Sequence, residues 1–203
     1  MEFRVTWRPF FLDPTLPREG KNKLDHYKSK FGEQRTAQML PGMIQHGLRD
    51  GIKFSYGGEI ANTLDAHRVA EMVNRRCGPT AGDKVMQEML SRYLEREQSP
   101  SSTVLLLESA RLALPELTER QLLVFLGRPV VPPATAEEQA EVMAWGPTPE
   151  QVREEATKWA RKYRISGVPH AVFGTDKADV EQISGAQDVG EFRAAIEAVL
   201  AEY

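Results

Sequence analysis

The spacing of apolar residues changes along this chain, and that change constrains the fold more than any other feature. Residues 2–8 alternate apolar and polar side chains, which is the period-two pattern of a strand. Between 24 and 163 the apolar residues follow helical spacing instead. Residues 168–173 and 180–184 then predict two strands joined by a turn, and residues 188–203 predict a last helix. This order predicts an α/β protein rather than a plain helical bundle.

The long middle block is predicted to be a series of helices. Residues 24–51 form two pieces broken near Gly32, and Pro41 should kink or restart the second piece. Asn62 has the character of a helix N-cap. The remaining helices are predicted at 62–76, 81–97, 101–114, 117–126, 135–145 and 150–163.

Composition narrows the classes of function. The net charge of −3 gives no electrostatic argument for nucleic acid or an anionic membrane. No run approaches the roughly 20 apolar residues of a membrane span, and the first residues lack a secretory signal, so a cytoplasmic protein is expected. The single cysteine, Cys77, lies at a predicted helix C-terminus, where the dipole opposes a thiolate, so a bystander is expected.

The other chemistry-bearing residues give weak signals. The four histidines have no metal-like spacing, so no metal site is predicted. The charge runs at 21–23 and 75–76 are interpreted as solvated surface. No phosphate-binding loop and no nucleophile elbow occurs.

Val168-Pro169 is the most informative dipeptide. A proline at the mouth of a strand, after a helix and before a hairpin, has two interpretations. A cis peptide bond would turn the preceding carbonyl and amide outward, where an extended substrate could pair with them. A trans proline would simply begin an edge strand.

Four blocks, taken in order, resemble the DsbA-like thioredoxin-domain family and in particular its FrnE-like members. The resemblance extends from residue 3 to residue 200, with the weakest fit at 130–147. The blocks are WRPFFLDP at 7–14, Asn62-Thr63 with Ala66-His67-Arg68, Gly167-Val168-Pro169, and Gly185-Ala186-Gln187.

The resemblance implies a thioredoxin-like fold with an inserted all-helical domain. Residues 1–20 and 148–203 would form the thioredoxin-like domain, and 21–147 the insertion. It also implies a Cys-x-x-Cys on the first helix, upstream of the strand that contains Trp7. This sequence begins at that second strand, so the first strand and the active-site helix are expected to be missing.

Three explanations for the missing segment follow. The sequence is a fragment of a full enzyme, the gap is closed by dimerisation or strand exchange through the exposed strand edge, or the protein is a diverged, non-catalytic relative. Dithiol–disulfide exchange needs an attacking thiolate and a resolving thiol. With Cys77 alone, no catalytic residue is predicted here.

The resemblance suggests three groups of substrate-binding residues. Each helix start also has an ordinary structural interpretation, in which the side chains cap or pack locally. The candidate residues are Val168, Pro169 and His170 at the bend, Gly185, Ala186 and Gln187 before the last helix, and Asn62, Thr63 and His67 at an earlier helix start.

The sequence therefore predicts a DsbA/FrnE-type thiol–disulfide oxidoreductase relative that is inactive as written. Its partner would be a thiol- or disulfide-containing protein or peptide. One alternative is glutathione-dependent isomerase or transferase chemistry, as in the 2-hydroxychromene-2-carboxylate isomerase and kappa types, with glutathione as cofactor. The other is a non-catalytic peptide-binding module. Neither nucleic acid nor membrane is expected as a partner.

Overall fold

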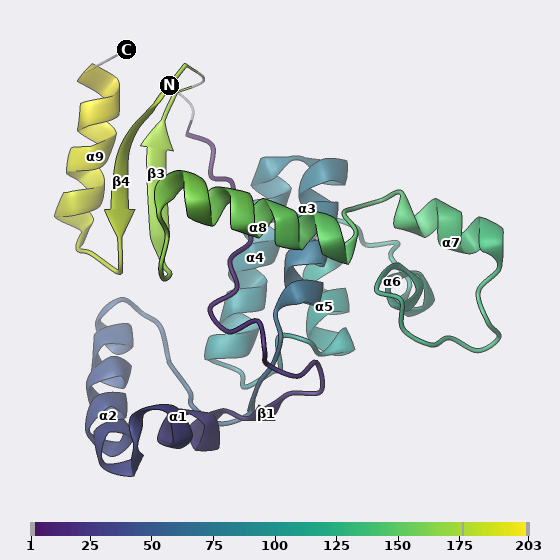
Figure 1. Cartoon of the computed structure of the whole chain (residues 1–203), viewed down its shortest axis with the longest axis horizontal. Helices are drawn as coiled ribbons and strands as arrows, with labels where there is room; N and C mark the ends of the chain where they lie inside the picture. The colour runs from purple at the N-terminus through teal and green to yellow at the C-terminus, as the bar shows by residue number, and fades with distance from the viewer. Residues whose placement is uncertain (1–2, 176, 202–203) are drawn as a thin grey trace. The chain divides into compact units, whose positions relative to one another are not determined.

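Helices make up most of the regular structure in the computed structural model of the chain, which describes residues 3–175 and 177–201 (Figure 1). Two short antiparallel strand pairs accompany them, so the protein is mixed α/β. The helices are α1 Lys23–Phe31, α2 Glu33–Arg49, α3 Leu64–Cys77, α4 Pro79–Leu94, α5 Thr103–Ala110, α6 Glu119–Phe125, α7 Ala136–Met143, α8 Pro149–Tyr163 and α9 Val189–Ala201. The strands are β1 Lys21–Asn22, β2 Glu59–Ile60, β3 His170–Gly174 and β4 Asp179–Ser184.

The chain divides into two compact units, Met1–Arg153 and Glu154–Tyr203. The boundary falls within α8. The assignment of a thioredoxin-like domain with a helical insertion stays a prediction, because the coarser mixed α/β class is what the elements establish.

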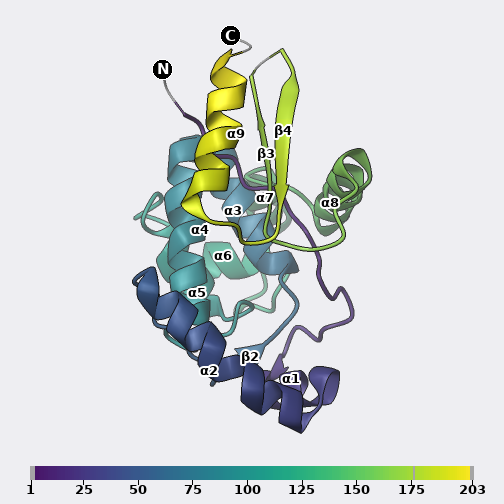
Figure 2. The same cartoon turned by 90° about the vertical axis from the view of Figure 1, so that its left-hand side faces the viewer.

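The core of the first unit lies among α3, α4, α5 and α6, which pack side by side (Figure 2). Apolar side chains three or four residues apart on each helix face this core, as helical spacing requires. Burying one such side chain contributes about 2 kcal/mol, so this cluster is the main source of the unit's stability. The fully buried apolar members are Val69, Met72, Val73, Val85, Leu105, Leu106, Ala110, Leu122 and Phe125.

Two glycines control how these helices join. Gly78 ends α3 at φ +85°, and its N–H donates to Asn74 O. It also serves as the N-cap of α4, whose first residue is Pro79. A positive φ suits glycine, and proline suits the first helical position, so the chain turns sharply between the two helices.

Gly146 lies where the chain passes across α3 and α6. A Cβ atom placed on it would come 2.8 Å from Met72 Cβ and 2.9 Å from Phe125 Cζ. Both neighbours are fully buried. The absence of a side chain therefore sets how closely this segment approaches the core.

The N-terminal segment differs from its prediction. Residues 3–10 form no strand, whereas the alternation predicted one at 2–8; Glu2 lies outside the described residues. A strand needs a neighbouring strand for its backbone hydrogen bonds, and residues 3–10 pair with none of the described strands, which explains the difference. Trp7 Nε1 instead donates to Asp83 Oδ1 at 2.7 Å, which attaches the segment to α4.

Two further expectations were wrong in detail. Lys23, expected to be solvated, is 2% exposed. The second helix was expected to kink or restart at Pro41; the restart does not occur, because α2 extends without a break from Glu33 to Arg49. Pro41 lies on an exposed stretch of this helix, where water can bond the carbonyl that proline leaves unpaired.

The second unit contains the β3–β4 hairpin, the end of α8, and α9. Strands β3 and β4 are antiparallel, with His170 opposite Ser184 and an irregularity between Phe173 and Gly174. Helix α9 packs against both strands (Figure 1). The rings of Phe173 and Phe192 meet edge to face at 5.8 Å between centroids. The predicted order of strand, turn, strand and helix is confirmed here.

Candidate functional site

The structure brings two of the three predicted groups together at one end of the β3–β4 hairpin. The Val168–Pro169 peptide bond is cis. Pro169 O accepts a hydrogen bond from Gly185 N at 2.9 Å. Val168 beside them has 51% of its surface exposed. This end of the hairpin therefore presents the side chains of Val168 and Pro169 and the backbone around them to solvent.

The outward edge of β3 follows from the strand register. In an antiparallel pair, residues that exchange hydrogen bonds alternate with residues whose N–H and C=O point away. Pro169 bonds Gly185, so Ala171 also faces β4, while His170 and Val172 direct their backbone groups to the opposite edge. Among the described residues, β3 pairs with β4 alone. The edge is thus a row of N–H and C=O groups without a strand partner.

The two faces of the hairpin have different chemistry. Phe173 lies on the face covered by α9. On the other face, His170 Nε2 lies 3.2 Å from Gln182 Oε1, and Val172 is half-buried beside them. A strand added to this edge would therefore place alternate side chains on an apolar face and on a polar one.

The start of α9 does not offer free amides for an anion. Asp188 Oδ1 accepts hydrogen bonds from Gly190 N at 2.7 Å and from Glu191 N at 3.2 Å. Gln187 Nε2 donates to Ser184 O at 3.1 Å. The capping carboxylate both fills these amides and adds negative charge, which disfavours binding of a glutathione carboxylate there.

Asn62, Thr63 and His67 belong to the first unit, whereas the other candidates belong to the second. Asn62 donates from Nδ2 to Pro14 O at 3.1 Å, and its Oδ1 accepts from Leu64 N at 3.0 Å. The N-cap position of α3 is Thr63 rather than the predicted Asn62. Thr63 O accepts from His67 N. These atoms hold the N-terminal segment and the first turn of α3, as the local interpretation predicted.

His67 packs under the N-terminal segment. Its Nε2 lies 3.2 Å from Phe10 O, and its ring meets the Phe11 ring edge to face at 5.3 Å. Burial lowers the pKa of His67 to about 4, and the Phe10 carbonyl only partly offsets this. The neutral imidazole therefore donates from Nε2, and its role here is structural.

A charged cluster around a buried carboxylate in the first unit was missed by sequence reasoning. Asp65, 2% exposed, lies between the guanidinium groups of Arg18 and Arg128. Burial alone would raise the pKa of Asp65, but hydrogen bonds and charge from both arginines outweigh it and lower the pKa. Arg128 Nε is buried without a hydrogen-bond partner in the described part of the chain.

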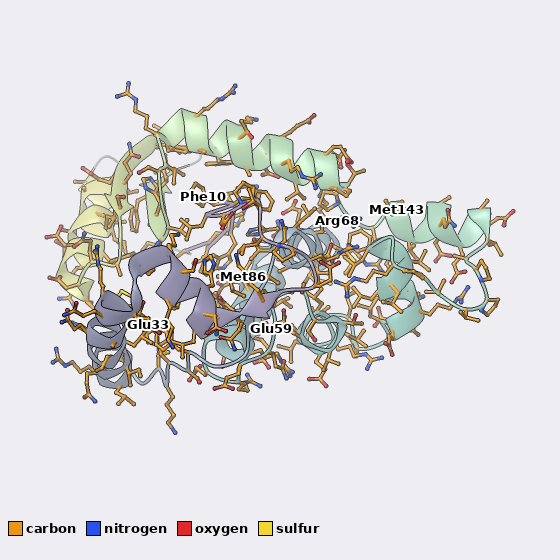
Figure 3. All side chains as sticks on the ribbon, turned by 60° about the horizontal axis from the view of Figure 1, so that its bottom comes forward. Phe10, Glu33, Glu59, Arg68, Met86 and Met143 are labelled. Carbon is orange, nitrogen blue, oxygen red and sulfur yellow. The ribbon has the colours of Figure 1, made fainter. Side chains whose placement is uncertain are left out.

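Arg68 is the largest fully buried side chain and clamps the end of α6. Its Nε donates to Pro147 O at 3.0 Å and its Nη2 to Phe125 O at 2.6 Å. Nη2 also approaches Met143 Sδ at 4.0 Å (Figure 3). Carbonyls at a helix C-terminus carry partial negative charge, so this contact stabilises the buried cation. These charged side chains meet partners that lie 47 or more residues away in the sequence, so no local sequence pattern indicates such contacts.

Lys23 is buried, although its sequence surroundings are those of a surface lysine. Its Nζ donates to Tyr93 O at 3.1 Å and to Ser55 O at 3.4 Å, and it lies 4.2 Å from the centroid of the Tyr93 ring. Burial lowers the pKa of this amine, against the smaller effect of Glu97. The ammonium thus joins α1 to the end of α4 rather than facing solvent.

Cys77 is exposed at the last residue of α3, with Sγ 3.7 Å from Ala113 O. It is the single cysteine of the 203 residues, so these residues contain no dithiol. Within 3–175 and 177–201, no three His, Cys, Asp or Glu side chains gather as metal ligands. Over the same ranges no helix has both the length and the apolar character needed to cross a bilayer. No family model matches the chain, and no curated protein matches it.

Proposed function

We propose that this chain is a DsbA-like thioredoxin-domain protein of the FrnE-like type whose second unit binds an extended segment of a thiol- or disulfide-containing protein. The observation that carries the proposal is the outward edge of β3. There His170 and Val172 direct their backbone groups away from β4, to an edge with no strand partner among the described residues, beside the exposed Val168 side chain. A peptide in extended conformation would continue the sheet along this edge.

The physical basis is the cost of leaving strand edges unpaired. A two-stranded hairpin is marginally stable in water, and each added backbone hydrogen bond contributes about 1 kcal/mol net. Two residues, His170 and Val172, offer N–H and C=O groups on the side away from β4. Main-chain bonding tolerates many sequences, so recognition of unfolded or extended polypeptides is the natural use of such an edge.

The proposed role of these residues is binding rather than thiol chemistry. Release of a mixed disulfide requires a resolving thiol, and Cys77 is the one cysteine of these residues. In an insulin-reduction assay with dithiothreitol, the 203-residue chain is expected to give the rate of the blank. Turnover above the blank would contradict this part of the proposal.

Binding is tested with reduced, carboxamidomethylated insulin B chain carrying a fluorescent label, followed by anisotropy. The Val172→Pro variant removes one outward N–H and leaves the β4 ladder intact, because Val172 lies in a non-bonded pair. Affinity should fall by about tenfold or more. Val172→Thr keeps the amide and the branched shape, so it should bind as the wild type does.

Two outcomes would overturn the proposal. One is equal binding by Val172→Pro, with a far-ultraviolet circular dichroism spectrum matching that of the wild type. The other is binding of glutathione, measured by titration calorimetry, with no binding of the B chain, which would favour the isomerase or transferase alternative instead.

A further inference from the structure

The segment near the N-terminus has the sequence pattern of a strand but no strand partner in the described part of the chain. Residues 3–8 have the alternation of a strand, and the apolar row is exposed: Phe3 by 65%, Val5 by 54% and Trp7 by 43%. Arg4 and Thr6 lie between them in sequence. No strand is assigned to this segment in the described residues. Exposed apolar residues in strand spacing signal a surface that associates.

The two features complement each other. The edge of β3 at His170 and Val172 has no neighbouring strand among the described residues. Residues 3–8 have the sequence pattern of a strand but join no sheet. We propose that residues 3–8 of one copy of the chain add to the outward edge of β3 in a second copy, reciprocally. This inference rests on the proposed function, because the exchanged segment would occupy the same edge as the polypeptide partner.

Side-chain alternation supports the pairing. An added strand places one row beside the α9-covered face, where Ala171 and Phe173 are only half-buried. The row of Phe3, Val5 and Trp7 is apolar and suits that face. The row that contains Arg4 and Thr6 then lies with the polar His170 face, next to water.

Charge supports the choice of partner. Strand β3, His170–Gly174, carries no lysine or arginine, so an added strand with two arginines meets no like charge on it. The segment 3–8 carries two arginines and no acid. Pairing of two 3–8 segments with each other would instead place like charges on neighbouring strands, which destabilises a sheet. The edge of β3 therefore avoids the like-charge contact that two paired 3–8 segments would make.

Reciprocal exchange also closes the assembly. Each copy gives one segment and receives one, so the same contact occurs twice about a two-fold axis and no further copies can add. The consequence is regulatory: self-association closes the polypeptide-binding edge, and dilution or a competing extended chain opens it.

Sedimentation velocity of the full chain over a range of concentrations tests the exchange. The wild type and Val5→Ile should form dimers. Val5→Asp, which puts a charge in the apolar row, and Val172→Pro, which removes an outward amide, should each shift the dimer dissociation constant upward by about tenfold or more. Circular dichroism establishes that each variant is folded.

A mixture of the two variants gives the sharpest readout. Val5→Asp keeps an intact β3 edge and Val172→Pro keeps an intact segment, so the mixture should contain a one-way heterodimer at concentrations where each variant alone is monomeric. A monomeric wild type, dimers that persist in Val5→Asp, or no heterodimer in the mixture would each overturn the exchange. A wild type that stays monomeric at every concentration tested and still binds labelled B chain would overturn the exchange and leave the proposed function standing.

Discussion

Arg18 binds Asp65 through two parallel hydrogen bonds, Nε to Oδ2 and Nη2 to Oδ1, each 2.8 Å long. The pair joins the N-terminal segment to the first turn of α3 across 47 residues of sequence. Arg128 Nη2 completes the arrangement at 2.6 Å from Oδ2. A carboxylate at a helix N-terminus thus holds two guanidinium groups from distant parts of the first unit.

Removing the negative charge of Asp65 should be costly. Asp65→Asn leaves Arg18 and Arg128 close together without their shared anion, and losing one partner of a buried ion pair costs about 3 kcal/mol or more. Urea unfolding should report this loss, whereas Asp50→Asn at the exposed end of α2 should change the free energy of unfolding by less than about 0.5 kcal/mol. Equal effects of the two substitutions would contradict the assigned role.

Acid should destabilise the first unit through His67. Because its pKa is lowered from 6.5 to about 4 in the folded state, the unfolded state binds more protons between these values, and stability falls as pH falls through this range. The full effect is about 3 kcal/mol. His67→Phe should flatten the slope of unfolding free energy against pH, and His46→Gln on the exposed side of α2 should leave it unchanged.

The contact between Gly58 and Glu97 should be intolerant of any side chain. Gly58 has φ +71°, and an added Cβ would collide with the backbone carbonyl oxygen of Glu97. Gly51 has φ +78° with nothing within 4 Å of an added Cβ, so Gly51→Ala carries only the backbone cost of about 1 kcal/mol. Gly58→Ala should lower the midpoint of thermal unfolding clearly more than Gly51→Ala does.

Tyr163 should stabilise the second unit through its hydroxyl. The hydroxyl donates to Asp179 Oδ2 at 2.7 Å, and Lys162 Nζ donates to the same oxygen at 2.8 Å. Tyr163 is buried, so Tyr163→Phe should cost about 1 kcal/mol. Amide hydrogen exchange in β3 and β4 should accelerate. Lys162→Gln, an exposed change, should have the smaller effect, and the reverse order would contradict this account.

Local sequence patterns were sufficient for most elements. The helices at 64–77 and 149–163 begin and end within two residues of their predicted bounds, because apolar residues at helical spacing and a Gly-Pro stop act locally. The β3–β4 hairpin was predicted for the same reason. The segment 3–8 shows the limit: its alternation is a strand pattern, but a strand also needs a partner that lies elsewhere in the sequence or in another molecule.

The charged interior could not have been predicted. Asp65 follows a helix N-cap, where acidic residues are ordinary, and Arg18 and Arg128 lie 47 and 63 residues away. Lys23 has the surroundings of a surface lysine in sequence. Of the candidate site, the bend at Val168 and its closeness to Gly185 follow from a hairpin register, which sequence can indicate. The structural use of His67 depends on where residues 10 and 11 cross α3.

The close approach of Gly146 to the core affects how the results of substitutions at this position should be interpreted. Any replacement there must displace Met72 or Phe125 from a filled interior, so a saturation library should be depleted at this position as severely as at a true recognition residue. Depletion by itself would then point to Gly146 as part of a functional surface. Comparing the abundance of each variant with its affinity for the polypeptide partner would distinguish a residue needed for packing from one that contacts the partner.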